Sequence, residues 1–151
     1  MRLSYCIVLF YSSLLLIKVT AQTPAIERDA LIALYNSTGG VNWNNNTNWN
    51  TTAPVDTWFG VTTNATGNVI NIDLNPTNDI AGANNLSGTL PTELGNLQSL
   101  VALDLSIGEI TGPIPTSLTT LANLQILNLF SNDLTGTIPV SYTHLTLPTK
   151  A

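Results

Sequence analysis

Two aspartates are the candidates for acid–base chemistry in this chain. Asp73 and Asp104 each stand between two apolar residues, in the triplets Ile72-Asp73-Leu74 and Leu103-Asp104-Leu105. On neighbouring strands both carboxylates would face the same side, with Cα atoms about 4.8 Å apart. That spacing approaches the roughly 5–5.5 Å between the carboxyl groups of retaining glycosidases. We nevertheless favour a structural role, because the shared face is open to water and Asn128 ends the column.

Other reactive side chains are scarce. The chain has one Cys and one His, His144, which lies near the C-terminus. Nucleophile–base pairs and zinc sites need more of both residue types, and a calcium site needs a carboxylate-rich loop. We therefore expect no catalytic residues, no cofactor and no metal site.

The charge balance argues against two classes of partner. The chain of 151 residues has four Lys and Arg against nine Asp and Glu, a formal net charge of −5, and only 9% of its residues are charged. Typical soluble domains have roughly 25% charged residues. A nucleic-acid-binding protein or a polybasic membrane-surface module needs a basic face, so we expect no nucleic-acid partner.

The N-terminus has the pattern of a secretory signal peptide. Arg2 precedes a mostly apolar run over residues 3–17, Lys18 ends it, and Val19-Thr20-Ala21 supplies small residues before Gln22. As a helix the run would cover about 22 Å, short of the roughly 30 Å bilayer core. We expect residues 1–21 to be cleaved rather than kept as an anchor. The protein would then be secreted or at the cell surface, without a membrane span in this chain and without cysteine.

A 24-residue repeat organises the C-terminal half. Pro91, Pro115 and Pro139 are 24 residues apart. Aligned on them, Leu118, Leu121, Leu124, Leu127, Leu129, Leu134, Gly136 and Ile138 fall on Leu94, Leu97, Leu100, Leu103, Leu105, Ile110, Gly112 and Ile114. An earlier third copy keeps this spacing over 84–91, but its strand, 69–74, is displaced by seven further residues, so 76–83 is interpreted as an insertion.

Each copy predicts a strand and a helical turn facing one interior. The L-x-L triplet has the period of a strand, whereas leucines three apart suit a 3₁₀ or α turn. Gly112 and Gly136 permit sharp turns, and the prolines after Ile114 and Ile138 stop strand pairing. Since each coil buries its leucines only against its neighbours, the pattern is that of a solenoid.

The pattern resembles the plant-type leucine-rich repeat, L-x-x-L-x-x-L-x-L-x-x-N-x-L-x-G-x-I-P, which here reads LTTLANLQILNLFSNDLTGTIP at 118–139. The resemblance implies an α/β solenoid: about three right-handed coils over 69–139, with short parallel strands on the concave face. It further implies that this face binds partners, a protein or peptide ligand foremost, with a carbohydrate as the alternative.

Residues 22–68 resemble the N-terminal cap of leucine-rich repeat proteins. A helix is expected from Pro24 to a stop at Gly39-Gly40, then a hairpin that turns at 64–67 and enters the first repeat strand.

Three tryptophans lie in this segment: Trp43, Trp49 and Trp58. They are expected to form the cap core rather than a carbohydrate platform. Plant caps usually carry a cysteine pair around W-x-G-V, where this chain has Thr57 and Thr62 or Thr63. This departure argues against a plant receptor or plant inhibitor, and the cap resembles those of exported bacterial and algal repeat proteins more closely.

The resemblance predicts a partner-binding surface on the concave strands. Its outward residues are expected to be Asn71, Asp73, Asn75, Ala102, Asp104, Ser106, Ile126, Asn128 and Phe130. Ile126 and Phe130 are the preferred contacts, because adjacent exposed apolar side chains mark interfaces. Three short strands offer roughly 200 Å², against about 800 Å² per partner in a standard interface. The chain is therefore expected to be the N-terminal fragment of a longer exported recognition protein.

Two alternatives stay open: a structural cell-surface or matrix glycoprotein, and the ectodomain fragment of a receptor kinase. The first draws on five N-x-S/T sequons, at Asn36, Asn45, Asn50, Asn64 and Asn85. A eukaryotic secretory pathway would glycosylate several of them, whereas in a bacterium they would have no meaning.

The last segment, 140–151, is interpreted as a non-native tail. Leucines are due at 142, 145, 148 and 151, but the chain offers Tyr, Leu, Pro and Ala. The string VSYTHLTLPTKA resembles a tail found on unrelated translated transcripts in which sequencing-adapter bases were read as codons. A short natural capping segment is the alternative.

Overall fold

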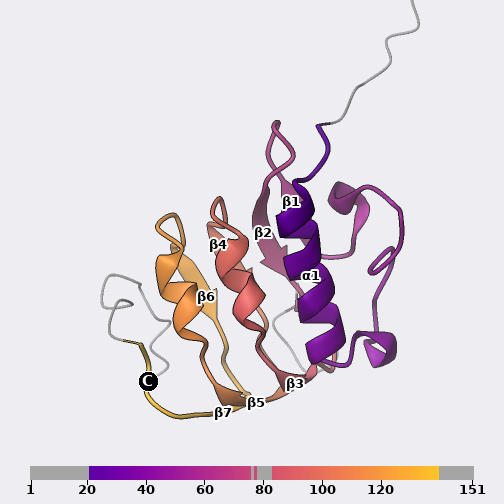
Figure 1. The fold of residues 1–151 in the computed structure, drawn as a ribbon. Coiled ribbons are helices and arrows are strands. Elements are labelled where there is room, and N and C mark those ends of the chain that lie inside the picture. Colours follow the sequence, from indigo (N-terminus) through magenta and orange to yellow (C-terminus); the bar gives the residue numbers. More distant parts are fainter. Residues whose placement is uncertain (1–20, 76, 78–82, 140–151) are drawn as a thin grey trace, which may run out of the picture.

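The computed structural model of the chain describes residues 21–75, 77 and 83–139 (Figure 1). Residues 1–20 of the predicted signal peptide (1–21) and the predicted non-native tail, 140–151, lie outside these residues. The described elements are one α-helix, α1 (Ala25–Ser37), seven short strands and four 3₁₀ turns, η1 (Gly40–Asn42), η2 (Val55–Thr57), η3 (Thr92–Asn96) and η4 (Thr116–Thr120). They form an N-terminal unit, residues 21–68, followed by stacked coils (Figure 1).

The first sheet contains the predicted strands in the order β1-β2-β4-β6. These are β1 (Val61–Thr63), β2 (Val69–Asp73), β4 (Ala102–Asp104) and β6 (Ile126–Asn128). β1 pairs with β2 antiparallel, and the other strands are parallel, with Ile72, Leu103 and Leu127 in register. The parallel pairing confirms both the 24-residue alignment and the seven-residue displacement of the first strand.

A second parallel sheet lies where the sequence predicted only sharp turns. It has the order β3-β5-β7, with β3 (Ser87–Thr89), β5 (Glu109–Pro113) and β7 (Asp133–Thr135). Gly112 and Gly136 take positive φ angles of 77° and 82°, as a left-handed turn requires. The segment after each L-x-L triplet thus turns and then pairs with its neighbours, so each coil is held by two ladders of backbone hydrogen bonds.

The core is a stack of leucines between the two sheets and the 3₁₀ turns. Fully buried leucines recur at equivalent positions of successive coils, as in Leu94 with Leu118 and Leu103 with Leu127. η3 and η4 cover these leucines from the side opposite the strands, which confirms the predicted helical turns. α1 packs along η3, so the helix continues this row of turns (Figure 1).

The N-terminal unit has an aromatic core instead. The ring centroids of Trp43 and Trp49 are 4.9 Å apart, those of Trp49 and Trp58 are 5.1 Å apart, and Tyr35 packs edge-on against Trp43. Each indole N–H donates to a backbone carbonyl, at distances of 2.9 to 3.2 Å. All three indoles are 5% exposed or less, so they present no ring face to a sugar.

Candidate partner-binding face

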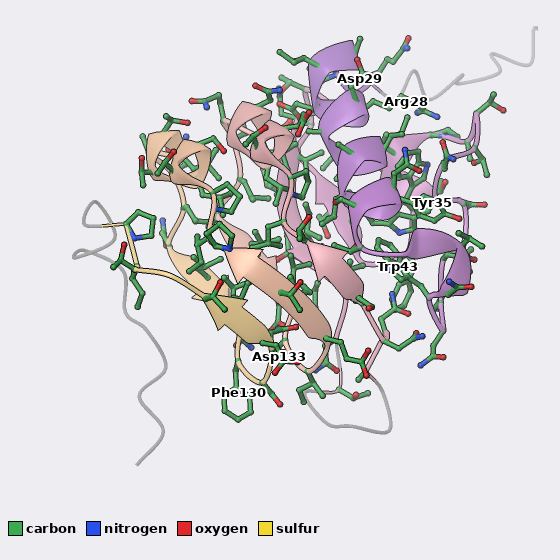
Figure 2. All side chains as sticks on the ribbon, turned by 60° about the horizontal axis from the view of Figure 1, so that its bottom comes forward. Arg28, Asp29, Tyr35, Trp43, Phe130 and Asp133 are labelled. Atoms are coloured by element: carbon green, nitrogen blue, oxygen red, sulfur yellow. The ribbon has the colours of Figure 1, made fainter. Side chains whose placement is uncertain are left out.

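The first sheet carries the expected row of residues on its open side. Register pairing places Asp73, Asp104 and Asn128 in one row, and Asn71, Ala102 and Ile126 in the adjacent row. Ile126 is 53% exposed and Phe130 is 51% exposed. The Phe130 ring projects away from the ribbon (Figure 2). The apolar side chains therefore gather at the β6 end of the face and the carboxylates at the β2 and β4 positions.

The row of Asp73, Asp104 and Asn128 also has a repeated structural role. Each side-chain oxygen accepts a hydrogen bond from the backbone N–H two residues further on, at 3.1, 3.0 and 3.2 Å. This is the geometry of an Asx turn, which bends the chain as it leaves the strand. Asp or Asn is therefore suited to this position whether or not a ligand binds there.

Asn75 and Ser106 correct the expected surface. Both were expected to face outward, but Asn75 is 1% exposed and Ser106 is 2% exposed. The reason is the Asx turn, after which strand alternation no longer holds. The Asn75 amide donates to the Ser106 hydroxyl at 3.2 Å, and that hydroxyl donates to the Asp104 carboxylate at 2.7 Å. These two residues link neighbouring coils from inside.

The two carboxylates differ in their surroundings. Asp104 accepts bonds from the Ser106 backbone and hydroxyl and from the Asn128 amide, the last at 2.7 Å. Asp73 accepts the Asn75 backbone N–H. Partial burial raises the pKa of Asp73 above its ordinary value, the Asn75 N–H opposes that rise, and the charge of Asp104 adds to it. The two carboxylates thus form a negatively charged patch, and a nearby cation would offset the repulsion between them.

An acid–base site on the two aspartates gains no support from the geometry. Two open hollows lie elsewhere: one of about 360 Å³ lined by Arg28 and Asp56 among others, and one of about 420 Å³ lined by Asn85 and Glu109 among others. Neither includes Asp73 or Asp104. Among the described residues no three His, Cys, Asp or Glu side chains converge as a metal site.

The asparagine positions of the repeat show how the coils are joined. Asn132 accepts the Ile110 N–H at 3.0 Å and donates to the Leu105 carbonyl at 2.9 Å, so it bridges two coils. Gly108 replaces it one coil earlier, where an added Cβ would lie 2.8 Å from the Leu86 carbonyl oxygen. A distance of 2.8 Å is too short for the Cβ of any side chain. Gly therefore occupies position 108, although the equivalent residue one coil later is Asn132.

The five sequons fall into three groups. Asn36 and Asn50 are exposed, and Asn45 and Asn64 use their side-chain oxygen in local turns. Asn85 is also exposed, but it accepts the Asn44 N–H at 2.8 Å and donates to the Asn42 carbonyl at 2.9 Å. The nitrogen that would carry a glycan is therefore engaged at Asn85, where the N-terminal unit meets the first coil.

Two important residues were not singled out from the sequence. Glu27, an acid in the first turn of α1, is 3% exposed. It accepts the Val69 N–H at 2.7 Å and the Asn68 amide at 2.9 Å. Ile107 has a φ of 58°, unusual for a β-branched residue. A single Glu in a helix gives no sequence signal for a buried hydrogen-bond acceptor. A single Ile in a loop gives no signal for a left-handed backbone conformation.

Solved structures share this architecture. They include the leucine-rich repeat ectodomain of the Arabidopsis thaliana receptor kinase SOBIR1, 20% identical over 83% of this chain and 65% of that one, with a TM-score of 0.61. That of GASSHO1/SCHENGEN3, a plant membrane receptor kinase from the same species solved in complex with CASPARIAN STRIP INTEGRITY FACTOR 2, is 30% identical over 79% and 14%, with a TM-score of 0.63. The BIR3–SERK2 complex, also from Arabidopsis, matches at 26% over 77% and 62%, with a TM-score of 0.60.

The sequence match and the fold point to the same class of protein. Residues 123–145 match the Leucine Rich Repeat family model, and comparison with curated proteins gives no significant match. The chain is consistent with the leucine-rich repeat family, and its structural neighbours include plant receptor ectodomains. It spans 65%, 14% and 62% of the three chains named above. Whether its cysteine-free N-terminal segment is closer to bacterial and algal proteins stays a prediction.

Membrane insertion finds no support in the described residues. No helix among them is long and apolar enough to cross a bilayer.

Proposed function

We propose that this chain is the N-terminal part of an exported recognition protein whose concave sheet binds a protein or peptide ligand. The observation that carries the proposal is a pair of exposed apolar side chains at the β6 end of the sheet, Ile126 on β6 and Phe130 two residues after its end. Exposed apolar side chains grouped in this way mark interaction sites more often than scattered ones do. A neighbouring plant receptor, solved in complex with CASPARIAN STRIP INTEGRITY FACTOR 2, supports a recognition role.

The proposal includes the N-terminal unit as a cap. Its aromatic core joins the leucine stack, and α1 lies along η3, so the unit covers the first coil's apolar end. A solenoid needs such a cover, because its first coil has no neighbour on that side. Export, cleavage after Ala21 and a non-native tail belong to the same proposal.

The binding surface is tested with a displayed library of random twelve-residue peptides. The full chain would be secreted, purified and used to select peptides, whose affinities are then titrated in solution. The double variant Ile126→Ala/Phe130→Ala should weaken the selected peptides about tenfold or more, a loss of about 1.4 kcal/mol in binding free energy. The matched control is Ile26→Ala/Val41→Ala, which removes two exposed apolar side chains from the N-terminal unit. Equal affinity for both variants would contradict the proposal.

The fragment proposal is tested by sequencing the intact transcript across the codons for residues 139–151. Further leucine-rich coils after Pro139 would support it, and they would also supply the missing interface area. A transmembrane span and a kinase domain downstream would favour the receptor alternative, which the receptor-kinase ectodomains among the neighbours support. A reading frame that ends at Ala151 would contradict the fragment proposal.

The glycoprotein alternative is favoured by the exposure of Asn36 and Asn50. Expression in a eukaryotic secretory host, followed by enzymatic deglycosylation and peptide mass spectrometry, would show which sequons are occupied. We expect glycans at Asn36 and Asn50 and none at Asn85, whose amide nitrogen donates to the Asn42 carbonyl. A glycosylated Asn85 in the folded protein would contradict this assignment.

A further inference from the structure

We propose that the ligand of the concave face is a peptide segment that sets a basic side chain against Asp73 and Asp104 and an apolar side chain against Ile126 and Phe130. The inference rests on the proposed recognition function and specifies its ligand chemistry. It is carried by the order of side chains across the sheet, by their exposure and by charge complementarity.

The acidic end of the face has no counter-charge among the described residues. Arg28 is the one Lys or Arg among them. Its guanidinium donates to the Thr51 and Ala53 carbonyls and lies 4.9 Å from the Trp58 ring centroid. Figure 2 places Arg28 on α1, well away from Phe130. The residues that the structure describes therefore supply no cation to Asp73 and Asp104, and a partner's basic side chain would be complementary to them.

The neighbours of the two aspartates favour a cation over a neutral donor. Register pairing sets Asp73 directly opposite Asp104 on adjacent parallel strands, about 4.8 Å apart between strands. Two carboxylates at that spacing repel each other; the pKa of Asp73 is raised mainly by its partial burial, and the charge of Asp104 adds to that rise. A guanidinium or ammonium group between them would replace that repulsion with attraction, and Arg can bond both carboxylates through its fork of N–H donors.

The apolar end of the same face sets the spacing within the ligand. Asp104 is paired with Asn128 at the end of β6, and Ile126 and Phe130 flank Asn128 along the chain. Crossing from β2 to β6 spans two inter-strand steps, about 9 to 10 Å, or roughly three extended residues. In the adjacent row, Ala102 of β4 lies between Asn71 and Ile126, so the side chain at the centre of that row is small. The ligand is thus expected to carry Lys or Arg two to four residues from an aliphatic or aromatic residue.

The test uses the same peptide selection with a different variant. Asp73→Asn/Asp104→Asn removes both charges, and each Asn keeps an oxygen that can accept the turn N–H. We expect peptides selected on the wild-type chain to be enriched in Lys or Arg near an apolar residue. Their affinity for this variant should fall about tenfold, and their affinity for the wild-type chain should weaken with added salt. Glu93→Gln, an exposed acid on η3, is the matched control and should leave the affinity unchanged.

The outcomes separate this inference from the proposed function. Peptides that depend on Ile126 and Phe130 but bind the Asp73→Asn/Asp104→Asn variant unchanged would overturn the basic–apolar ligand and leave concave-face recognition standing. Peptides indifferent to both double variants would overturn both. Urea denaturation of each variant establishes that it is folded, so a loss of binding can be assigned to the changed side chains.

Discussion

The N-terminal unit and the repeat coils bury apolar side chains by different means. The coils use the same leucine positions again and again, and their backbones are joined by two parallel ladders. The N-terminal unit uses side chains that occur once: three indoles packed against one another, one buried glutamate and one arginine that hydrogen-bonds a loop. A coil is therefore stabilised by contacts that recur in its neighbours, whereas each contact of the N-terminal unit occurs once.

The largest expected effect is in the aromatic core. Trp49 packs against Tyr35, Trp43 and Trp58 and is 3% exposed. Trp49→Ala should lower the free energy of unfolding by about 3–5 kcal/mol, because it removes a large buried ring and leaves a cavity. Urea denaturation followed by tryptophan fluorescence measures it. Val41→Ala, at a 73% exposed position, should stay within about 0.5 kcal/mol of wild type.

A cost below about 1 kcal/mol for Trp49→Ala would contradict the comparison, since the indoles would then not act as a core.

The next effect tests the junction between the two regions. Glu27 on α1 accepts the Val69 N–H at the start of β2. Glu27→Ala should destabilise the fold by about 1–3 kcal/mol, because the buried N–H loses its acceptor. Urea denaturation measures the loss. Asp29→Ala is the matched control, since Asp29 is an exposed acid on the same helix. Equal effects of the two substitutions would mean that the Glu27 contact contributes nothing specific.

The same contrast explains how much the sequence could predict. Periodicity determines the register of β2, β4 and β6, because a one-residue slip would turn every leucine to the wrong face. The second sheet was missed because its strands are only three to five residues long, β3 and β5 contain Gly, and β5 also contains Pro. Along the candidate face, strand alternation predicted the row containing Asp73 and Asp104. It failed at Asn75 and Ser106, where Asx turns end the alternation.

The local residue pattern was least informative where a contact reaches far along the chain. Glu27 and Val69 are 42 residues apart, and no nearby motif marks either residue as a partner of the other. Gly108 is the converse case, in which a departure from the repeat is explained only by the position of the Leu86 carbonyl. Repetition makes contacts between equivalent positions predictable, and contacts that occur once lack that redundancy.

A smaller effect, opposite in sign, is expected where a repeat turn has an unfavourable residue. Ile107 and Ser131 occupy equivalent positions and have φ angles of 58° and 55°. Because Asn tolerates left-handed backbone better than a β-branched residue, Ile107→Asn should stabilise the fold by about 1 kcal/mol. The change in urea midpoint measures it, with Ser131→Asn expected to give a smaller gain. Destabilisation by Ile107→Asn would show that packing of the Ile side chain outweighs the backbone strain.

The smallest effect concerns Asp73 and depends on pH. A carboxyl with a pKa raised in the folded chain binds its proton more tightly when folded, so its contribution favours folding in acid and is lost as pH rises through the folded pKa. At pH 7 the ionised Asp73 therefore opposes folding. Asp73→Asn should raise the urea midpoint at pH 7, and the gain should disappear below the ordinary pKa of 3.8. Asp56→Asn, at an exposed site, controls for the general loss of one negative charge. If Asp73→Asn lowered stability at both pH values, the carboxylate would matter more as the acceptor of the Asn75 N–H than as a repelled charge, and the case for a basic ligand at this end of the sheet would weaken.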